Sequence, residues 1–307
     1  MAYNVATPAG PSVVTSHDSG DKATGIIAIE GVEMAEPSPA AGDYIFIAQQ
    51  TDGIQSVEVT DPANPIRHGK YTPTAGQRVE DVAISTNRLC TVWTDGFRVV
   101  NIGNPPAPVL MGFYDTNQSV GVAAHGDYAY VASRGDGLYV IDISDPSNPV
   151  ATGRYDTTGQ AYDVVDSGGY AYVADYNSGL TLVDVSTPSA PTLAGTYDVP
   201  KSVYTVAVTG DYAYVGSFSD GVYVVDVSTP SAPVEIANIY PGGNIRNLFI
   251  SGNYLYIARS ISGLDVYYID DKLNSPKVGE FDTGDEAYDV FVAGNRIYLA
   301  DFRAGSW

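Results

Sequence analysis

Acidic residues recur at equivalent positions of a repeat that runs through the sequence. Asp81, Asp163 and Asp289 each begin a short apolar segment, and Asn247 takes the same place in another repeat. Gathered around one axis, three carboxylates and an amide could hold a cation or a hydrated polar ligand. The alternative is a water-filled funnel in which the aspartates cap strand ends. The choice depends on the elements that carry these residues.

Those elements belong to a repeat of about 42 residues. A turn proline recurs at steps of 41 to 43 residues, at Pro65, Pro108, Pro149, Pro191, Pro233 and Pro276. Each period holds four runs of aromatic and β-branched residues, separated by Gly, Pro, Asn, Asp or Ser, which predicts four short strands. No stretch has the apolar period of a helix. We therefore predict an all-β fold, a propeller of four-stranded antiparallel blades.

The two ends of the chain are predicted to share one blade. Residues 303–307 stand where a third strand should begin, and residues 3–11 match the end of such a strand and the turn after it. Pairing the ends would remove an open sheet edge. We predict one domain over residues 1–307, a seven-bladed β-propeller whose ring is closed by pairing N-terminal and C-terminal segments in one blade. An acidic insertion is expected near residues 30–41.

Three segments carry a recognisable motif. Residues 138–146, 180–188 and 222–230 read LYVIDISDP, LTLVDVSTP and VYVVDVSTP, and they resemble the LVIVD repeat family. The resemblance implies a β-propeller that is extracellular or on the cell surface. The aspartates that recur in the motif, Asp142, Asp184 and Asp226, are predicted to accept backbone N–H bonds at strand ends.

Binding residues are expected on one face of the ring. There, the loop that enters each innermost strand lies beside the loop between the second and third strands of a blade, and loops on a rigid scaffold commonly carry binding residues. Aromatic, arginine and aspartate residues gather in both sets of loops. The predicted ligand-binding residues are Asp81, Asp163, Asn247, Asp289, Tyr162, Tyr288, Arg134, Arg246 and Arg259.

Calcium is a candidate cofactor at two matching turns. Asp18 and Asp21 flank Ser-Gly, and Asp282 and Asp285 flank Thr-Gly. Because Ca²⁺ takes about six to eight oxygen ligands, two carboxylates in a turn supply only part of its coordination shell.

The overall charge limits the partners. The chain has 36 acidic and 15 basic residues and a formal net charge of −21, which repels phosphate backbones, so no nucleic acid partner is expected. No membrane insertion is expected, because the longest apolar run, residues 25–29, is too short to cross a bilayer. A protein or glycan ligand and self-association both remain as hypotheses. The single cysteine, Cys90, is expected in the core.

No catalytic motif stands out. His17, His68 and His125 lie in different repeats without the spacing of a zinc site, and nucleophile-elbow and phosphate-loop motifs are missing. The sequence predicts a non-enzymatic extracellular or cell-surface binding or structural module that recognises a protein or a glycan through its loops. One alternative is a propeller enzyme acting on a polysaccharide or a small polar substrate in the central funnel. Another is a self-assembling component of a surface array or filament.

Overall fold

The chain folds into β-strands joined by tight turns. The computed structural model describes residues 2–4, 12–15, 22–32, 42–72 and 76–301, and within these ranges no helix occurs. Consequently, no described segment is a helix long and apolar enough to cross a membrane. Aromatic and β-branched residues form the strands, and Gly, Asn, Asp and Pro occupy the turns, as the composition of each repeat predicts.

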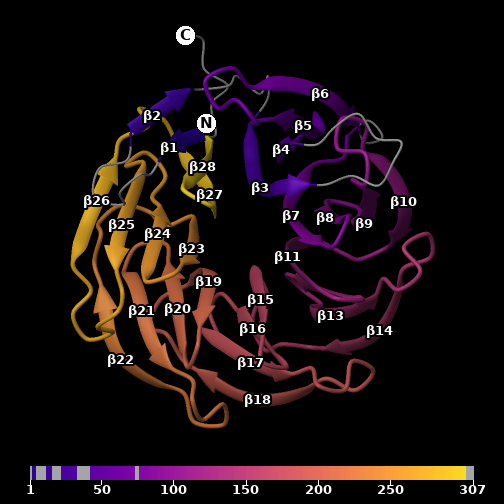
Figure 1. Ribbon diagram of the computed structural model, residues 1–307. Helices are drawn as coiled ribbons and strands as arrows, with labels where there is room; N and C mark the ends of the chain where they lie inside the picture. Colours follow the sequence, from indigo (N-terminus) through magenta and orange to yellow (C-terminus); the bar gives the residue numbers. More distant parts are fainter. Residues whose placement is uncertain (1, 5–11, 16–21, 33–41, 73–75, 302–307) are drawn as a thin grey trace.

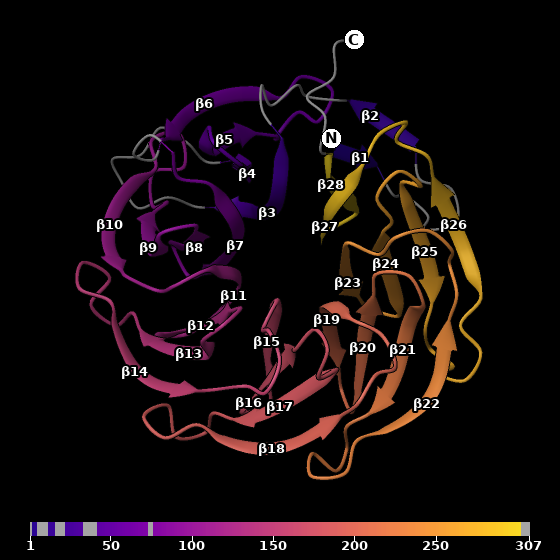
Figure 2. The same cartoon turned by 180° about the vertical axis from the view of Figure 1, so that it is seen from behind.

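Six blades are each built from four consecutive antiparallel strands, with the first strand innermost and the fourth outermost (Figures 1 and 2). The first three blades are β3–β6 (Ala23–Val32, Gly42–Gln49, Gly53–Glu58, Ile66–Tyr71), β7–β10 (Val79–Ser85, Arg88–Trp93, Gly96–Asn101, Val109–Tyr114) and β11–β14 (Ser119–His125, Tyr128–Ser133, Gly137–Asp142, Val150–Tyr155). The next three are β15–β18 (Asp163–Ser167, Tyr170–Ala174, Leu180–Asp184, Thr192–Tyr197), β19–β22 (Val203–Thr209, Tyr212–Ser217, Gly221–Asp226, Val234–Ile239) and β23–β26 (Asn247–Ser251, Tyr254–Ala258, Leu264–Tyr268, Lys277–Phe281).

The prediction of seven repeat blades is corrected to six blades of consecutive strands. The remaining four strands form a sheet of mixed origin, in which β27 (Ala287–Ala293) and β28 (Arg296–Asp301) join β1 (Ala2–Asn4) and β2 (Ser12–Thr15) in the order β2-β1-β28-β27. Each end of the chain contributes only two strands, so this sheet is not a blade of four consecutive strands.

The mixed sheet completes the ring. Ala2, Tyr3 and Asn4 of β1 pair with β28 in antiparallel register, and the mixed sheet stands between the β3–β6 and β23–β26 blades (Figure 1). The pairing of N-terminal with C-terminal strands therefore occurs in the structure. The predicted insertion at residues 30–41 lies largely outside the described residues.

The core lies between neighbouring blades, where facing sheets cover each other. Between the fourth and fifth blades, Tyr172, Leu182, Val206 and Val215 belong to one buried cluster. In the second strand of the third to sixth blades, two tyrosines stand two residues apart; the second is buried, whereas the first is only partly buried. Cys90 is fully buried, as expected. Large rings thus fill the space between sheets.

The recurring turn prolines form a seam on the outside of the ring. In β14, Gly153 lies against the turn of the next blade so closely that a methyl group there would overlap the carbonyl oxygen of Pro188 and lie 2.7 Å from Pro191 Cδ. Gly112 and Gly195 meet the corresponding turns in the same way. The proline turn and the outer-strand glycine are therefore two halves of one inter-blade contact, which explains why both recur with the same period.

The motif aspartates act as predicted. The carboxylate of Asp142 accepts the backbone N–H of Ser144 at 2.8 Å, and Asp184 and Asp226 accept those of Ser186 and Ser228, each at 2.9 Å. Hydrogen bonds from the serine hydroxyl and from this serine N–H lower the pKa of each of the three carboxyls, which are partly exposed to solvent. The repeated aspartate is therefore a turn-capping group.

Candidate functional site

The innermost strands present a tier of acidic and amide side chains to the centre of the ring. This acid tier consists of Asp81 on β7, Asp163 on β15, Asn247 at the start of β23 and Asp289 on β27. The same four residues line two central cavities, so the acid tier lies at the level where these meet. Equivalent positions in the repeat thus place these residues together, as the period predicts.

Each aspartate of the acid tier connects two neighbouring blades. One carboxylate oxygen of Asp163 accepts the N–H of Val164 at 2.7 Å, and the other accepts the N–H of Val206, in the next blade, at 3.0 Å. Asp81 bonds Val82 and Val122 in the same way, at 2.7 and 2.9 Å. Asp289 bonds Val290 at 2.8 Å and Ile26 at 2.7 Å. These carboxylates hold the inner strands together, and the Asp289 bond ties the mixed sheet to the first blade.

The position of the acid tier makes its carboxyls hard to ionise. Burial raises the pKa of Asp163 to about 6 and that of Asp289 to about 7, although backbone N–H donors oppose the shift at both residues. Burial, together with the charges of Asp289 and Asp163, raises the pKa of Asp81 well above its ordinary value. Part of the acid tier is therefore protonated near neutral pH.

Above the acid tier opens the mouth cavity, a hollow of about 390 Å³. Its wall is formed by the residues just before the acid tier and by the loops between second and third strands. Besides the acid tier, its lining comprises Thr24, Gln50, Arg78, Glu80, Val120, Gly121, Arg134, Tyr162, Tyr204, Thr205, Phe218, Ile245, Arg246 and Tyr288. Its volume is in the range of small-ligand sites.

Arginines and aromatic rings stack along the wall of the mouth cavity. The guanidinium carbon of Arg134 lies 4.8 Å from the ring centre of Tyr162, and that of Arg246 lies 5.0 and 4.6 Å from the rings of Phe218 and Tyr288. Tyr204 connects the two groups, with its ring centre 4.8 Å from that of Tyr162 and 5.5 Å from that of Phe218. We call these six residues the stacked arc. Such cation–aromatic contacts fix the planes of both groups.

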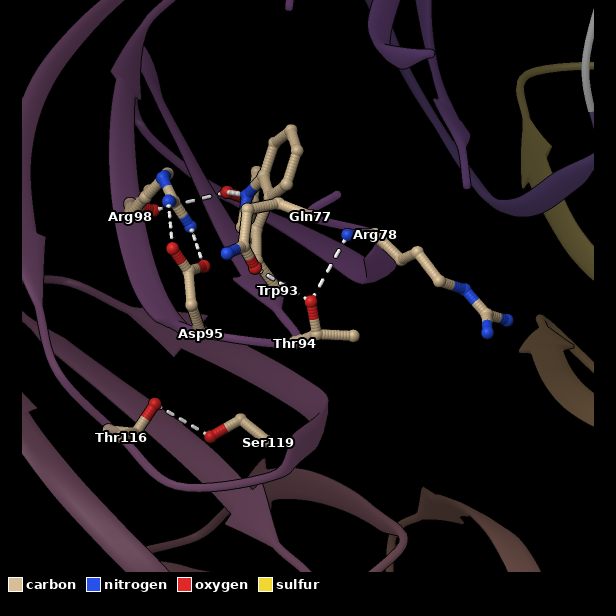
Figure 3. A network of polar contacts seen from close by, with 9 residues as sticks. Gln77, Arg78, Trp93, Thr94, Asp95, Arg98, Thr116 and Ser119 are labelled. Atoms are coloured by element: carbon tan, nitrogen blue, oxygen red, sulfur yellow. Dashed lines mark hydrogen bonds and ion pairs between the residues drawn. The ribbon is translucent and has the colours of Figure 1, made fainter. Parts of the chain in front are cut away.

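A third arginine reaches the mouth cavity from the second blade. A threonine in the β8–β9 turn anchors its backbone, because Thr94 Oγ1 accepts the N–H of Arg78 at 3.2 Å and donates to Gln77 Oε1 at 2.8 Å. Nearby, Arg98 pairs with both oxygens of Asp95 at 2.6 and 2.7 Å. Figure 3 shows the side chain of Arg78 extending away from this network, and it lines the mouth cavity.

One carboxylate belongs to the wall itself. Glu80 lines the mouth cavity, and burial raises its pKa against the opposing charges of Arg78 and Arg134. The wall therefore combines three guanidinium groups with one carboxyl whose pKa is raised. Electrostatically, the upper part of the cavity favours a negatively charged group.

The structure brings eight of the nine predicted ligand residues to the mouth cavity. Arg259 is the exception, since it does not line that cavity. Its guanidinium donates to the backbone oxygens of Pro241, Gly242 and Ser262 and pairs at 2.8 Å with the buried Asp265, which also pairs with Lys277 at 2.9 Å. Arg259 therefore holds the loop before β23 in place.

Sequence reasoning missed Arg78, Tyr204 and Phe218 as wall residues. A signal for Tyr204 was available, because it precedes Thr205 just as Tyr162 precedes Asp163 and Tyr288 precedes Asp289. Phe218 occupies the same turn position as Arg134. Arg78 lies in a loop that matches no other repeat, so only the fold reveals its position.

The predicted calcium turns are only partly described. Asp18 and Asp21 lie outside the described residues. The carboxylate of Asp282 accepts the N–H of Gly284 at 2.8 Å, and that of Asp285 accepts the N–H of Glu286 at 3.0 Å. Within the described ranges, no group of three His, Cys, Asp or Glu side chains is arranged to hold a metal ion. This finding covers the acid tier, whose carboxylate oxygens bind backbone N–H groups.

Below the acid tier lies a second hollow of about 340 Å³, the lower cavity. Its wall is mostly apolar, with Ile27, Val165, Phe249 and Phe291 among the lining residues, and the two phenylalanine rings are 4.8 Å apart. The chemistry of the two cavities therefore differs, and the polar groups concentrate in the mouth cavity.

Comparison with solved structures is consistent with the fold. The crystal structure of the computationally designed Ika8 protein superposes with a TM-score of 0.61 over 84% of this chain and 78% of that one, at 11% sequence identity. This likeness concerns the fold alone. No functionally curated protein matches the sequence.

A family model matches most of the chain. The model of the LVIVD repeat matches six segments, residues 39–73, 76–116, 118–157, 158–199, 201–240 and 242–271. Each match falls in one of the six blades of consecutive strands, and none covers the mixed sheet. The six matches agree with the corrected count of blades. The chain belongs to the LVIVD repeat family.

Proposed function

We propose that this protein is a non-enzymatic binding module that holds a small polar segment of its ligand in the mouth cavity. One observation carries the proposal: the stacked arc lines a hollow of about 390 Å³. Rigid aromatic rings beside fixed charged groups are the usual components of a recognition site. The six blades and the mixed sheet hold the arc in place, with a core between neighbouring sheets.

We place the module outside the cell or on its surface. The net charge of −21 suits a soluble protein in a salty medium, and the LVIVD family is commonly found in secreted or surface proteins. Among the ligand classes considered, a glycan fits the mouth cavity better than a folded protein, because sugars stack on aromatic rings and offer hydroxyls to a polar floor.

Binding to an array of defined oligosaccharides, followed by calorimetric titration of the best binder, tests the proposal. Tyr162→Ala and Phe218→Ala each remove one ring of the stacked arc and should weaken binding about tenfold. Leu193→Ala is the matched control, because Leu193 is 51% exposed on the outer strand β18. Equal affinities in all three variants would place the ligand elsewhere.

An enzyme acting on a polysaccharide is a second candidate, favoured by one observation. The carboxyls of Asp163 and Asp289 have pKa values raised to about 6 and about 7 in the floor of the mouth cavity, and such carboxyls can serve as general acids. Against this stands the use of both oxygens of each aspartate in bonds to backbone N–H groups, one in its own strand and one in the neighbouring blade. Release of new reducing ends from a bound glycan, abolished in Asp289→Asn, would favour the enzyme.

A further inference from the structure

We infer that the ligand segment in the mouth cavity is acidic: a hexuronic acid unit of a glycan, bound by its carboxylate to Arg134 and Arg246. This inference rests on the proposed function, since it specifies the ligand of the same site. It depends on how the arginines are partnered, on the geometry of the stacked arc and on the polarity of the floor.

Within the described residues, the arginines of the mouth cavity differ from five other arginines in having no ion pair with an acidic side chain. Five arginines elsewhere pair with aspartates: Arg88 with Asp127, Arg98 with Asp95, Arg154 with Asp136, Arg259 with Asp265 and Arg296 with Asp43. In the described part of the chain, Arg78, Arg134 and Arg246 make no ion pair, and all three line the mouth cavity. In a chain with 36 acidic residues, three such guanidinium groups at one cavity indicate an anion supplied from outside.

The geometry leaves these guanidinium groups available to a carboxylate. The guanidinium carbons of Arg134 and Arg246 lie over aromatic rings, 4.6 to 5.0 Å from the ring centres, and these contacts use none of the N–H donors in a hydrogen bond. The Nε atoms of Arg134 and Arg246 are buried and lack a hydrogen-bond partner in the described structure, as does Arg259 Nε, so a carboxylate would meet the terminal Nη atoms of these groups. A carboxylate accepts two parallel N–H bonds from one guanidinium, which matches the geometry of a fixed arginine.

The floor of the mouth cavity favours a sugar over a peptide. Below the arginines, the ligand meets Asn247, Thr205 and the acid tier. The amide of Asn247 and the hydroxyl of Thr205 can donate to and accept from several sugar hydroxyls, and each carboxyl oxygen of the acid tier keeps a lone pair beside its backbone bond, whereas an apolar peptide side chain of comparable size would leave these groups unpaired. Aromatic rings of the stacked arc offer flat surfaces to the C–H face of a pyranose. An acidic sugar could therefore bind the arginines through its carboxylate and the polar floor through its hydroxyls.

Calorimetry with a chemically matched pair of probes tests the charge directly. Oligogalacturonate and its methyl ester have the same sugar backbone and differ in the carboxylate charge, and glucuronate and mannuronate oligomers extend the series. We expect the acid to bind about 10- to 100-fold more tightly than the ester, the range for hydrogen bonds to a charged group. Raising the salt concentration should weaken binding of the acid and leave that of the ester nearly unchanged.

Arginine variants test whether the preference for the acid over the ester arises in the mouth cavity. Arg134→Gln and Arg246→Gln should each reduce affinity for the acid about tenfold while sparing the ester. Arg154→Gln should bind like the wild type, because Arg154 lies on the outer strand β14 and pairs there with Asp136 of the β12–β13 turn. Thermal unfolding confirms that each variant is folded, and the salt dependence of the wild type gives a second test that needs no variant.

Three results would overturn the inference, and they differ in what they imply. Equal binding of acid and ester, unaffected by both variants, would remove the acidic ligand but leave the proposed glycan-binding function. Binding only of peptides with a free C-terminal carboxylate would replace the sugar by a peptide. Absence of binding to neutral and acidic glycans and to these peptides would remove the proposed function as well.

Discussion

Replacing Gly153 by alanine tests whether the outer seam stabilises the ring. A methyl group at this position would overlap Pro188 O and lie 2.7 Å from Pro191 Cδ. Ordinary carbon–oxygen contacts, in comparison, are about 3.3 Å long. Because Pro188 belongs to the neighbouring blade, relief requires either the turn to move or β14 to bend. Either movement separates two blades along their outer edges.

Two opposing effects set the magnitude. Overpacking of a tight contact costs about 1 to 3 kcal/mol, and loss of glycine flexibility in the unfolded chain returns about 0.4 to 1 kcal/mol. We expect Gly153→Ala to lower the free energy of unfolding by about 1 to 2 kcal/mol. Gly135→Ala is the control, because a methyl group at Gly135 meets nothing within 4 Å and the residue has no positive φ; it should leave stability unchanged or slightly raised.

Urea denaturation followed by circular dichroism measures both variants. Comparison of their midpoints at equal slopes isolates the change in stability. If Gly153→Ala were as stable as the wild type, or if Gly135→Ala lost as much, the inter-blade contact would not explain why glycine and the proline turn recur together.

Three further predictions concern buried charges and the core. Arg259→Ala should lower the free energy of unfolding by about 3 kcal/mol, because it removes one partner of the fully buried Asp265, and it should leave ligand affinity unchanged in the folded protein; a loss of affinity at unchanged stability would contradict this assignment. Because Asp163 and Asp289 hold protons more tightly when folded, with pKa values of about 6 and 7 against an ordinary 3.8, their contribution to stability is greatest below about pH 4 and is lost as pH rises through those values. The urea midpoint should therefore decrease as the pH is raised from about 4 to about 8, and it should decrease less steeply in an Asp163→Asn, Asp289→Asn double variant. An identical dependence of the midpoint on pH in that variant would exclude these two groups as the cause. The thiol of Cys90, whose pKa is raised to about 12 by burial, should react with a thiol reagent only on unfolding, so rapid reaction of the native protein would show that the core opens locally.

The regular parts of the fold could be predicted because they repeat. Strand positions, turn types and the capping role of Asp142 recur in several blades, and each blade satisfies its backbone in the same way. The pairing of β1 with β28 also followed from the period. The count of seven equivalent blades was wrong, because the two ends of the chain contribute only two strands each to their shared sheet.

The site could be predicted only in part, because sequence position places a residue on a strand without giving the direction of its side chain. Arg134 and Arg259 occupy neighbouring positions in their β-turns, yet Arg134 lines the mouth cavity and Arg259 turns to Asp265. Arg259 pairs with Asp265, which occupies the strand position that Thr181 holds in the fourth blade. Similarly, the aspartates of the acid tier were expected as ligand groups, but their bonds to Val122, Val206 and Ile26 show that they also connect blades.

A crystal structure of the protein bound to an oligogalacturonate, or to whichever uronate oligomer binds most tightly, shows directly whether the stacked arc holds an acidic sugar. We expect one sugar ring in the mouth cavity, stacked beside Tyr162, with its carboxylate within hydrogen-bond distance of Arg134 or Arg246. A sugar bound in the lower cavity or on the outer strands, with the stacked arc unoccupied, would contradict this expectation.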